Sequence, residues 1–142
     1  MMVTVVDASG HALGRLASIV AKRLLQGEEI ALVNAEQAVL TGRRAQILQD
    51  YRERRARGAQ KRKGPFYPRR PDNLVRRTVR GMLPYQQPKG RVAFKRLRVY
   101  VGMPSDLKAQ TAERLPEASR ITTARVVTLA EVARNLGSEW GG

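Results

Sequence analysis

The first 35 residues carry a strand, a helix and a second strand, and this order restricts the chain to folds with a parallel pair of strands. Residues 3–6 and 30–33 are short apolar runs, and the second has no polar break, as expected for a strand covered on both faces. Between them, apolar side chains recur at spacings of three and four residues, which predicts an amphipathic helix. These side chains are Leu13, Leu16, Ala17, Val20 and Leu24. We therefore predict a β-α-β unit with a right-handed crossover, whose helix ends near Gly27.

A second helix is predicted to begin at Thr41 and Gly42. Ile47, Leu48 and Tyr51 share one side of this helix, and the apolar stripe stops after Tyr51. The residues that follow are mainly arginines spread around the helix axis. Because this end of the helix has nothing to bury, we expect it to project from the body of the domain.

A third helix is predicted to have Asp72 as its N-cap and to stop at Pro84. Its core-facing stripe, at spacing i, i+4 and i+7, is predicted to be Val75, Val79 and Met82. Residues 91–96 are expected to add a short helical turn. Residues 97–101 alternate between apolar and other side chains, which predicts a strand.

The last third of the chain is clear only near its end. Residues 103–124 show no periodic pattern, and residues 125–127 are a weak strand candidate. Thr128 is followed three residues later by Glu131, which is the spacing of a capping box at the start of a helix. This helix is predicted to end at Gly137.

Positive charge is concentrated in residues 43–98, which we call the basic segment. The basic segment holds 19 of the 27 lysines and arginines but three of the 12 acids, and the flanking segments are nearly neutral. Such a concentration repels itself in a compact fold unless a polyanion neutralises it, so it is typical of proteins that bind polyphosphate chains. A basic face kept for solubility is the alternative.

Within the basic segment, residues 58–71 are interrupted by glycine and proline and have no periodicity. They are predicted to form an extended loop without a fixed structure of its own. The chain as a whole, residues 1–142, is predicted to be a single α/β domain that carries this basic loop. The start of the chain lacks the pattern of a signal peptide, and no apolar run approaches the length of a membrane span, which favours the cytoplasm.

Residues that support catalysis are scarce. The chain has no cysteine and one histidine, His11, which is expected to be a surface residue or the partner of a helix start. Gly10 and Gly14 lie between a strand and a helix, where nucleotide-binding folds place phosphates, but no complete glycine-rich motif is present. These glycines are expected to serve a tight turn and close packing of helix on sheet. We therefore predict no catalytic residue, no metal and no cofactor.

The basic segment points to RNA. Arginines outnumber lysines there, and the planar guanidinium suits bidentate contact with phosphate. Phe66, Tyr67 and Tyr85 lie among the charges, where rings can stack on unpaired bases or can anchor the segment to the body. No helix-turn-helix, zinc finger or RNP motif is present. Recognition of shape and backbone by a long basic segment fits folded RNA better than duplex DNA.

Several separated motifs support a family resemblance. They are residues 6–18, 33–36, 41–42, 79–84, 90–91 and 95–102. In this order and spacing they resemble the large-subunit ribosomal protein L13 family over the first hundred residues. After Gly102 the chain reads Met-Pro-Ser-Asp instead of the histidine-proline-histidine run of the bacterial members. The chain is therefore more similar to the archaeal and eukaryotic branch.

The resemblance implies a three-layer α/β/α fold around a small, mostly parallel central sheet, to which the residue pattern adds a basic protruding helix end and loop. It implies a structural constituent of the large ribosomal subunit that binds large-subunit ribosomal RNA, supports subunit assembly and contacts neighbouring ribosomal proteins in the cytoplasmic ribosome. It implies no enzyme activity, no cofactor, no membrane and no small-molecule substrate. The RNA-contacting residues carried over from the family's motif are Arg80, Gly81, Gly90, Arg91, Lys95 and Arg96.

Charge alone adds the remaining predicted RNA-binding residues. In the stretch from residue 52 to residue 70 they are Arg52, Arg54, Arg55, Arg57, Lys61, Arg62, Lys63, Tyr67, Arg69 and Arg70. Further along they are Arg76, Arg77 and Lys89.

Two alternative functions remain open at this point. The first is a free-standing RNA-binding translational regulator, which co-sedimentation with large subunits at high salt would distinguish from a ribosomal protein. The second is a nucleotide-binding enzyme that uses Gly10 and Gly14, which saturable binding of a mononucleotide would favour.

Overall fold

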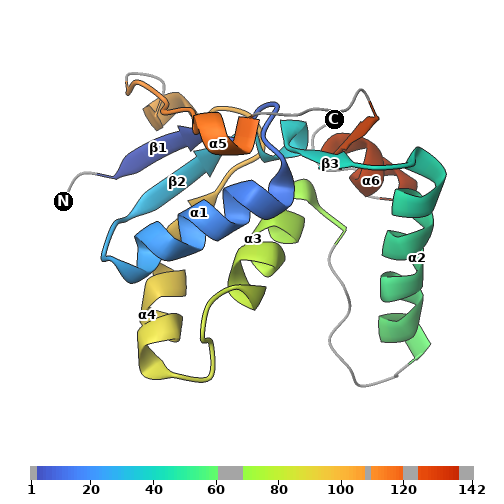
Figure 1. Cartoon of the computed structure of the whole chain (residues 1–142), viewed down its shortest axis with the longest axis horizontal. Coiled ribbons are helices and arrows are strands. Elements are labelled where there is room, and N and C mark those ends of the chain that lie inside the picture. The colour runs from blue at the N-terminus through green and yellow to red at the C-terminus, as the bar shows by residue number, and fades with distance from the viewer. Residues whose placement is uncertain (1–2, 61–68, 108–109, 120–124, 138–142) are drawn as a thin grey trace.

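The computed structural model describes residues 3–60, 69–107, 110–119 and 125–137, and within these ranges two small sheets pack with six α-helices (Figure 1). The larger sheet has three parallel strands in the order β1-β2-β4. They are β1 (Thr4–Asp7), β2 (Ile30–Val33) and β4 (Leu97–Val99). This arrangement agrees with the predicted three-layer α/β class and its mostly parallel sheet.

Strand β2 forms the centre of the sheet. Its residue Ile30 is opposite Thr4 of β1 and Leu97 of β4. All four residues of β2 are buried, so the prediction of a strand covered on both faces is confirmed. Ile30 and Leu32 belong to the main hydrophobic core, which also contains the buried side chains of the first helix.

Helix α1 (Leu13–Leu25) connects β1 to β2 and buries the predicted stripe of leucine, alanine and valine side chains. The helix ends at Gln26, and Gly27 adopts a φ of 102°, which a residue with a side chain rarely adopts. Gly10 has a φ of 72°, so its predicted role in a tight turn is confirmed. Gly14 is exposed and a Cβ there would meet no atom within 4 Å, so the predicted role of Gly14 in close packing is wrong.

Helices α3 (Pro71–Gly81) and α4 (Pro88–Lys95) pack against α1. The N-cap of α3 is Arg70 and not Asp72, because Pro71, which has a fixed φ and no N–H, occupies the first helical position. The predicted stripe is right for Val75 and Val79, which are fully buried. It is wrong for Met82, which caps the end of the helix and is 44% exposed. Helix α4 confirms and lengthens the turn predicted at 91–96.

The second sheet pairs β3 (Val39–Thr41) with β5 (Val126–Thr128) in antiparallel register. Strand β3 was not predicted, and the second helix, α2 (Arg44–Gln60), begins at Arg44 and not at Thr41. The three residues of β3 are too few to show a clear alternation of apolar and polar side chains. Its hydrogen-bonding partner, β5, lies far along the chain. The strand predicted at 125–127 is present one residue later.

Helix α2 lies beside α6 (Leu129–Asn135), and Figure 1 shows its C-terminal half extending away from the rest of the domain. Leu48 and Tyr51 are buried, whereas residues 52–54 are exposed, which agrees with the predicted protruding basic end. The helix continues to Gln60 and α3 begins at Pro71, so the loop predicted over 58–71 is wrong for residues 58–60 and for Pro71. The central part of that loop, residues 61–68, lies outside the described residues.

Helix α6 has the predicted capping box. The Thr128 hydroxyl oxygen accepts a hydrogen bond from the backbone N–H of Glu131 at 3.3 Å. Gly137 follows the helix with a φ of 88°. Short helical elements complete the description, namely η1 (Ala35–Gln37), η2 (Ser105–Leu107) and α5 (Pro116–Ser119).

His11 is fully buried, so the expectation of a surface residue is wrong, whereas its bond to Leu115, directly before α5, agrees with the alternative of a helix-start partner. Its Nε2 accepts a hydrogen bond from the backbone N–H of Leu115 at 2.9 Å, and its Nδ1 therefore donates to the carbonyl oxygen of Ser9 at 3.0 Å. The imidazole joins the turn after β1 to the segment before α5. The single histidine of the chain is thus a structural residue.

Asp7 provides a test of pH dependence at the carboxyl end of β1. Burial raises the pKa of its carboxyl, but hydrogen bonds from Ser9 and Asn34 and the charge of Arg114 bring the pKa below its ordinary value. A carboxyl with a lowered pKa stabilises the fold above its unfolded-state pKa, and this contribution is lost as the pH falls through the folded-state pKa. We expect Asp7→Asn to lose less stability than the unmodified chain between about pH 5 and pH 2, measured by urea unfolding at each pH. An equal loss in both proteins would contradict this prediction, and Asp106→Asn, at an exposed carboxylate, is the control.

Candidate nucleic-acid interface

Helix α3 separates an apolar face from a basic one. Leu74, Val75 and Val79 are buried against the core. At 100° per residue, positions 76, 77 and 80 lie on the opposite side of the helix axis from these three. Arg77 and Arg80 are exposed there, and Arg76 is partly buried. The sequence of α3 therefore presents cations on the side that the core does not use.

Arg76 is held by the body of the domain. Its guanidinium carbon lies 4.8 Å from the ring centroid of Phe94 in α4, and its Nη1 donates to the carbonyl oxygen of Leu97 at 3.4 Å. Arg76 is therefore less exposed than Arg77 and Arg80, and its contact with RNA stays a prediction. Its cation joins α3 to α4 and to the start of β4.

Arg80, one turn after Arg76 on the same helix, belongs to the same row of aromatic and cationic contacts. Tyr85 contacts Phe94 edge to face, with centroids 5.8 Å apart and an interplanar angle of 80°. The guanidinium carbon of Arg80 lies 4.3 Å from the centroid of the Tyr85 ring. The order is therefore Arg76, Phe94, Tyr85 and Arg80, with each member restricting the next. Such contacts reduce the number of rotamers that Arg80 and Tyr85 sample before a ligand arrives.

Gly90 allows α4 to approach the turn that precedes it. The residue is buried, and a Cβ placed on it would lie 2.0 Å from the carbonyl oxygen of Pro84 and 2.4 Å from its carbonyl carbon. No side chain fits in this space. Gly90 thus has a role in the backbone packing of the turn, and its contact with RNA stays a prediction.

We expect Gly90→Ala to destabilise the domain by about 1–3 kcal/mol, because the added methyl group forces the backbone at Pro84 to move. Gly81→Ala is the matched control, since a Cβ on Gly81 would meet no atom within 4 Å and alanine favours the helix. The control should be neutral or slightly stabilising. Urea unfolding of both variants tests the pair, and equal stability of the two would contradict the close approach.

The end of α3 and the turn after it enclose an open hollow of about 750 Å³, which we call the turn hollow. Arg77, Arg80 and Gly81 line it from α3, and residues 83–87 line it from the turn. The turn is kept in shape by backbone hydrogen bonds, in which Tyr85 donates to Leu83 at 2.8 Å and Gln87 donates to Pro84 at 2.9 Å. Two predicted arginines and one predicted glycine thus lie around a single hollow.

Helix α4 adds further cations of two kinds. Lys89, Arg91 and Lys95 are exposed. Arg96 is partly buried, and its Nη1 donates to the carbonyl oxygen of Leu24 at 2.9 Å, at the C-terminal end of α1. Arg96 is therefore anchored to the body, whereas the other three present their charge at the surface.

The predicted residues of α2 lie at a separate place. Arg52 donates through Nε to the side-chain oxygen of Asn135 at 2.7 Å, and the Arg54 guanidinium carbon lies 4.9 Å from the ring centroid of Tyr51. Arg55 and Arg57 belong to the helix by their backbone. Within the described side chains, Arg52 and Arg54 are exposed and present their charge on this part of α2.

The connection between α2 and α3 is described only at its end. Arg69 and Arg70 are exposed, and Arg70 donates through Nε to the Asp72 carboxylate at 3.2 Å. The other residues predicted there lie outside the described residues. They are Lys61, Arg62, Lys63 and Tyr67, together with the candidate aromatic Phe66.

The family model for ribosomal protein L13 matches residues 1–106, which include the whole basic segment. The chain belongs to the ribosomal protein L13 family.

Relatives extend the match over almost the whole chain. The large ribosomal subunit protein uL13 of Archaeoglobus fulgidus is 50% identical over 137 residues, which cover 94% of this chain and 87% of the relative. The proteins of the same name from Methanocaldococcus jannaschii and Methanosarcina barkeri are each 49% identical over 140 residues, covering 96% of this chain and 99% of each relative. The L13 family consists of ribosomal proteins and not of enzymes, so the predicted class is confirmed. Archaeal relatives also agree with the resemblance seen after Gly102.

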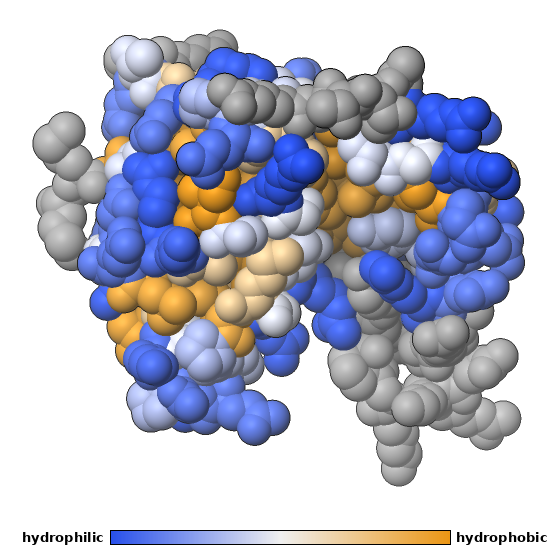
Figure 2. Space-filling view, viewed as in Figure 1, coloured by the Kyte–Doolittle hydropathy of each residue, from blue (hydrophilic) through white to orange (hydrophobic). Residues whose placement is uncertain are grey.

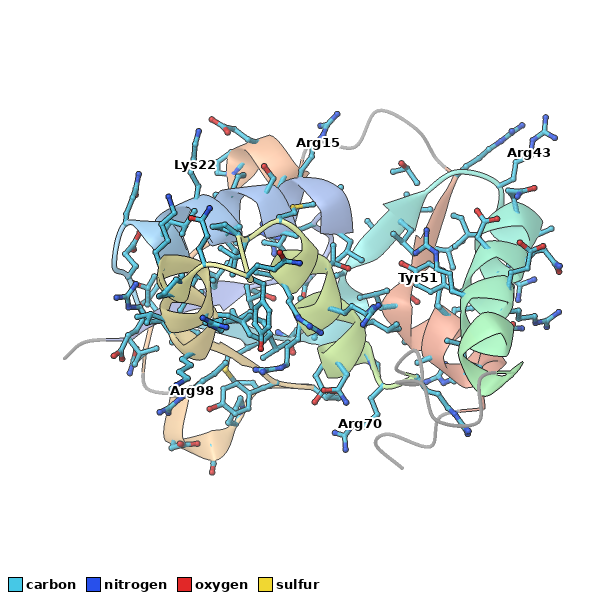
Figure 3. The ribbon with its side chains drawn as sticks, turned by 90° about the horizontal axis from the view of Figure 1, so that it is seen from below. Arg15, Lys22, Arg43, Tyr51, Arg70 and Arg98 are labelled. Carbon is cyan, nitrogen blue, oxygen red and sulfur yellow. The ribbon has the colours of Figure 1, made fainter. Side chains whose placement is uncertain are left out.

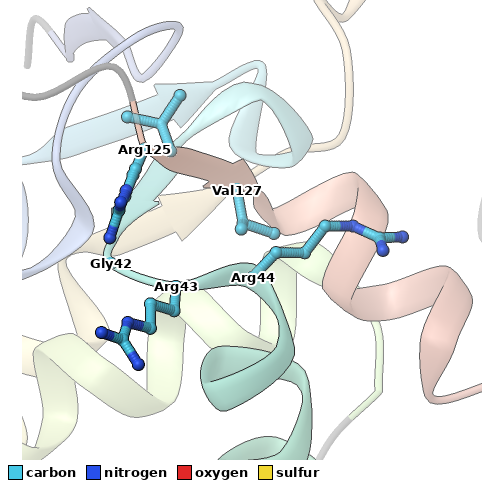
Figure 4. Close-up of a pocket in the computed structure, with 6 residues that line it drawn as sticks. Gly42, Arg43, Arg44, Arg125 and Val127 are labelled. Atoms are coloured by element: carbon cyan, nitrogen blue, oxygen red, sulfur yellow. The ribbon is translucent and has the colours of Figure 1, made fainter.

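In this L13 family member, one basic site was not predicted. Arg43, Arg44 and Arg125 surround a hollow of about 450 Å³ at the start of α2, which is also lined by Gly42 and Val127 (Figure 4). Figure 4 shows Arg43 and Arg125 on one side of the hollow, while Arg44 extends to the other side, where it pairs with Glu131. Arg43 and Arg44 begin the basic segment, so charge counting could have included them. Arg125 is remote in sequence, and the pairing of β3 with β5 brings it to this hollow.

Basic side chains cover more than one side of this L13 protein. Figure 3 shows Arg15 and Lys22 extending from α1 on the side opposite to Arg70 and Arg98. Figure 2 shows hydrophilic residues over much of this face, with apolar residues gathered between them mainly toward the left. In the described part of the chain, no helix is long and apolar enough to cross a membrane. The same part contains no group of three or more histidine, aspartate or glutamate residues that could hold a metal ion.

Proposed function

We propose that this chain is a structural constituent of the large ribosomal subunit and binds large-subunit ribosomal RNA through the basic surfaces of α2, α3 and α4. The observation that carries the proposal is that α3 buries its apolar face against the core and exposes arginines on its other face. Family membership supplies the ribosome as the setting, and the cytoplasmic ribosome is the location that follows from it. Neighbouring ribosomal proteins are the further partners that we propose.

The interface in this proposal combines direct and positioning residues. The direct contacts are assigned to exposed cations of α2, α3 and α4 and to the cations of residues 61–63. Arg76 and Arg96 are assigned a positioning role, because their guanidinium groups contact Phe94 and the Leu24 carbonyl oxygen. We also propose that residues 1–142 act as one domain and that binding of this domain supports assembly of the subunit.

The proposal predicts a steep dependence of RNA affinity on salt. Each neutralised phosphate contributes about −0.7 to −0.9 to the slope of log K against log salt concentration. With on the order of 6–10 phosphate contacts, we expect a slope between about −4 and −9. Fluorescence anisotropy titrations of a large-subunit ribosomal RNA fragment at several KCl concentrations measure this slope. A flat response would contradict an interface based on phosphate contacts.

The alternative function, a free-standing RNA-binding regulator, makes a different prediction about location. A structural constituent should remain with large subunits during sedimentation at high salt, because neighbouring contacts hold it in place. A regulator should leave the subunits and remain at the top of the gradient. Sedimentation of a tagged chain followed by detection in each fraction distinguishes these two results.

A further inference from the structure

We propose that the turn hollow binds one unpaired nucleotide of RNA, with the base stacked on the ring of Tyr85. This inference rests on the proposed RNA-binding function and adds the form of RNA that this part of the surface recognises. Neither the family match nor the basic charge of the segment specifies that form, because duplex RNA and single-stranded RNA carry the same phosphates.

The aromatic surface needed for stacking is present and oriented. Tyr85 is 36% exposed, so part of its side chain is open to a ligand. The Arg80 guanidinium lies over one face of the ring and Phe94 contacts the ring edge to face, so a base would stack on the part of the ring that these contacts leave exposed. Because Gly90 fits against Pro84 without a side chain, the turn that carries Tyr85 is also fixed at its backbone. A ring fixed in this way loses little conformational entropy when a base stacks on it.

Cations lie beside the same ring. Arg77 and Arg80 line the turn hollow from α3, within one helical turn of each other. A guanidinium can contact phosphate oxygens with two parallel hydrogen bonds, and it can also stack on a base through its planar face. Phosphate and base of one nucleotide can therefore be held from the same end of α3.

Polar groups suited to a base edge complete the turn hollow. Gln86 and Gln87 are exposed and line it next to Tyr85. Within the described residues, neither carboxamide takes part in a hydrogen bond, and the Gln87 side chain does not cap α4. A carboxamide offers a donor and an acceptor side by side, which matches the polar edge of an unpaired base.

An unpaired nucleotide can contact the Tyr85 ring, the arginines and the glutamine carboxamides together, whereas other polyanions would contact only the arginines. Duplex RNA keeps its bases stacked inside the helix and offers phosphates and sugars to side chains, so Tyr85 and the carboxamides would be left without a function. An isolated phosphate needs only the arginines. The volume of about 750 Å³ lies within the range of roughly 300–1,000 Å³ that is usual for pockets that take a small ligand.

Two RNA hairpins test the proposal with the full chain. One carries 2-aminopurine as a single unpaired bulge, and the other carries it in a base pair, with equal numbers of phosphates in the stem and loop. At one fixed salt concentration, we expect the bulged hairpin to bind on the order of tenfold more tightly, as measured by anisotropy. We also expect binding to quench the fluorescence of the bulged 2-aminopurine and to leave that of the paired one unchanged.

Four variants assign the preference to the turn hollow. Tyr85→Leu should remove the tenfold preference, and Tyr85→Phe, which keeps the ring face, should retain it. Gln86→Ala combined with Gln87→Ala should reduce the preference without lowering affinity for the paired hairpin. Lys22→Ala is the charge control, because Lys22 is exposed on α1, and it should leave the preference unchanged. Thermal unfolding of each variant verifies that the domain is folded.

The outcomes separate this inference from the function on which it rests. If both hairpins bind with equal, salt-dependent affinity and no quenching, the inference is overturned while RNA binding stands. If neither hairpin nor ribosomal RNA binds, the proposed function fails and the inference fails with it. Retention of the preference in a folded Tyr85→Leu variant also overturns the inference, because the base would then be bound elsewhere.

Discussion

Replacing Val79 with aspartate should unfold the domain. Val79 is fully buried in α3, where it joins the main hydrophobic core with Leu74 and Val75. An aspartate there costs about 4 kcal/mol to protonate at pH 7, and burying the polar group without a partner costs roughly 2–7 kcal/mol more. Because natural domains are stable by about 5–15 kcal/mol, this loss removes most or all of the folded population. Circular dichroism and hydrogen exchange should both report the loss of cooperative structure.

The control for Val79→Asp adds the same charge to the same helix at an exposed position. Asn73 is exposed in the first turn of α3, where a negative charge interacts favourably with the helix dipole. Asn73→Asp should therefore keep the stability of the unmodified chain. A folded Val79→Asp variant would show that the faces of α3 are assigned the wrong way round.

Removing two exposed arginines of α3 together should abolish most of the RNA affinity without unfolding the chain. Arg77→Ala and Arg80→Ala each remove a charge-assisted hydrogen bond worth roughly 1.5–3 kcal/mol when made to phosphate, so the pair should weaken binding by about 3–6 kcal/mol. Alanine is the best helix former, and the loss of the Arg80 contact with Tyr85 costs only about 0.5–1 kcal/mol at an exposed site. The measurement is a titration of ribosomal RNA at constant salt, paired with urea unfolding.

The double variant needs a control with the same loss of charge. Arg15→Ala with Lys22→Ala also removes two cations, from the exposed side of α1. If the effect is local to α3, this control should lose much less affinity. Equal losses in the two double variants would show that net charge, and not the position of the arginines, determines binding.

Arg76 is left out of this variant, although its position on the helix suggested that it belongs with Arg77 and Arg80. Helical spacing places these arginines on one arc, and that part of the prediction is correct. The spacing gave no information about Phe94, which packs under Arg76 from a different helix. The exposure of an arginine depends on neighbouring helices, so periodicity alone could not show that Arg76 packs on Phe94 while Arg77 and Arg80 are exposed.

The same physical limit explains the other differences in the fold. The α1 stripe and the Thr128 capping box were predictable because their interactions span a few residues. His11 was misplaced because its partner, the N–H of Leu115, is 104 residues away. Strand β3 was missed because it is completed by β5 from the far end of the chain. Met82 continues the spacing of Val79 but falls after the last turn of the helix, where the stripe no longer faces the core.

The candidate site was predictable in outline and not in detail. Counting charge located the basic segment, and the motif residues from Arg80 to Arg96 placed the end of α3 and part of α4 in it. The turn hollow could not be derived from charge, since its shape depends on the contact between Gly90 and Pro84. Direct RNA contact by each of the residues named remains a prediction until the titrations are made.

The position of β4 has a consequence for the order of folding. Its hydrogen-bonded neighbour β2 precedes it by more than sixty residues, and most of the lysines and arginines lie in the chain between these two strands. Strand β4 can pair with β2 only after the whole connecting chain has closed into a loop. The entropy cost of closing this loop is incurred before the contact between the strands stabilises it. Repulsion within the returning chain opposes the same step and weakens as ions screen it. A polyanion that gathers these cations should therefore accelerate closure of the sheet, so that RNA acts on the rate of folding as well as on the final complex.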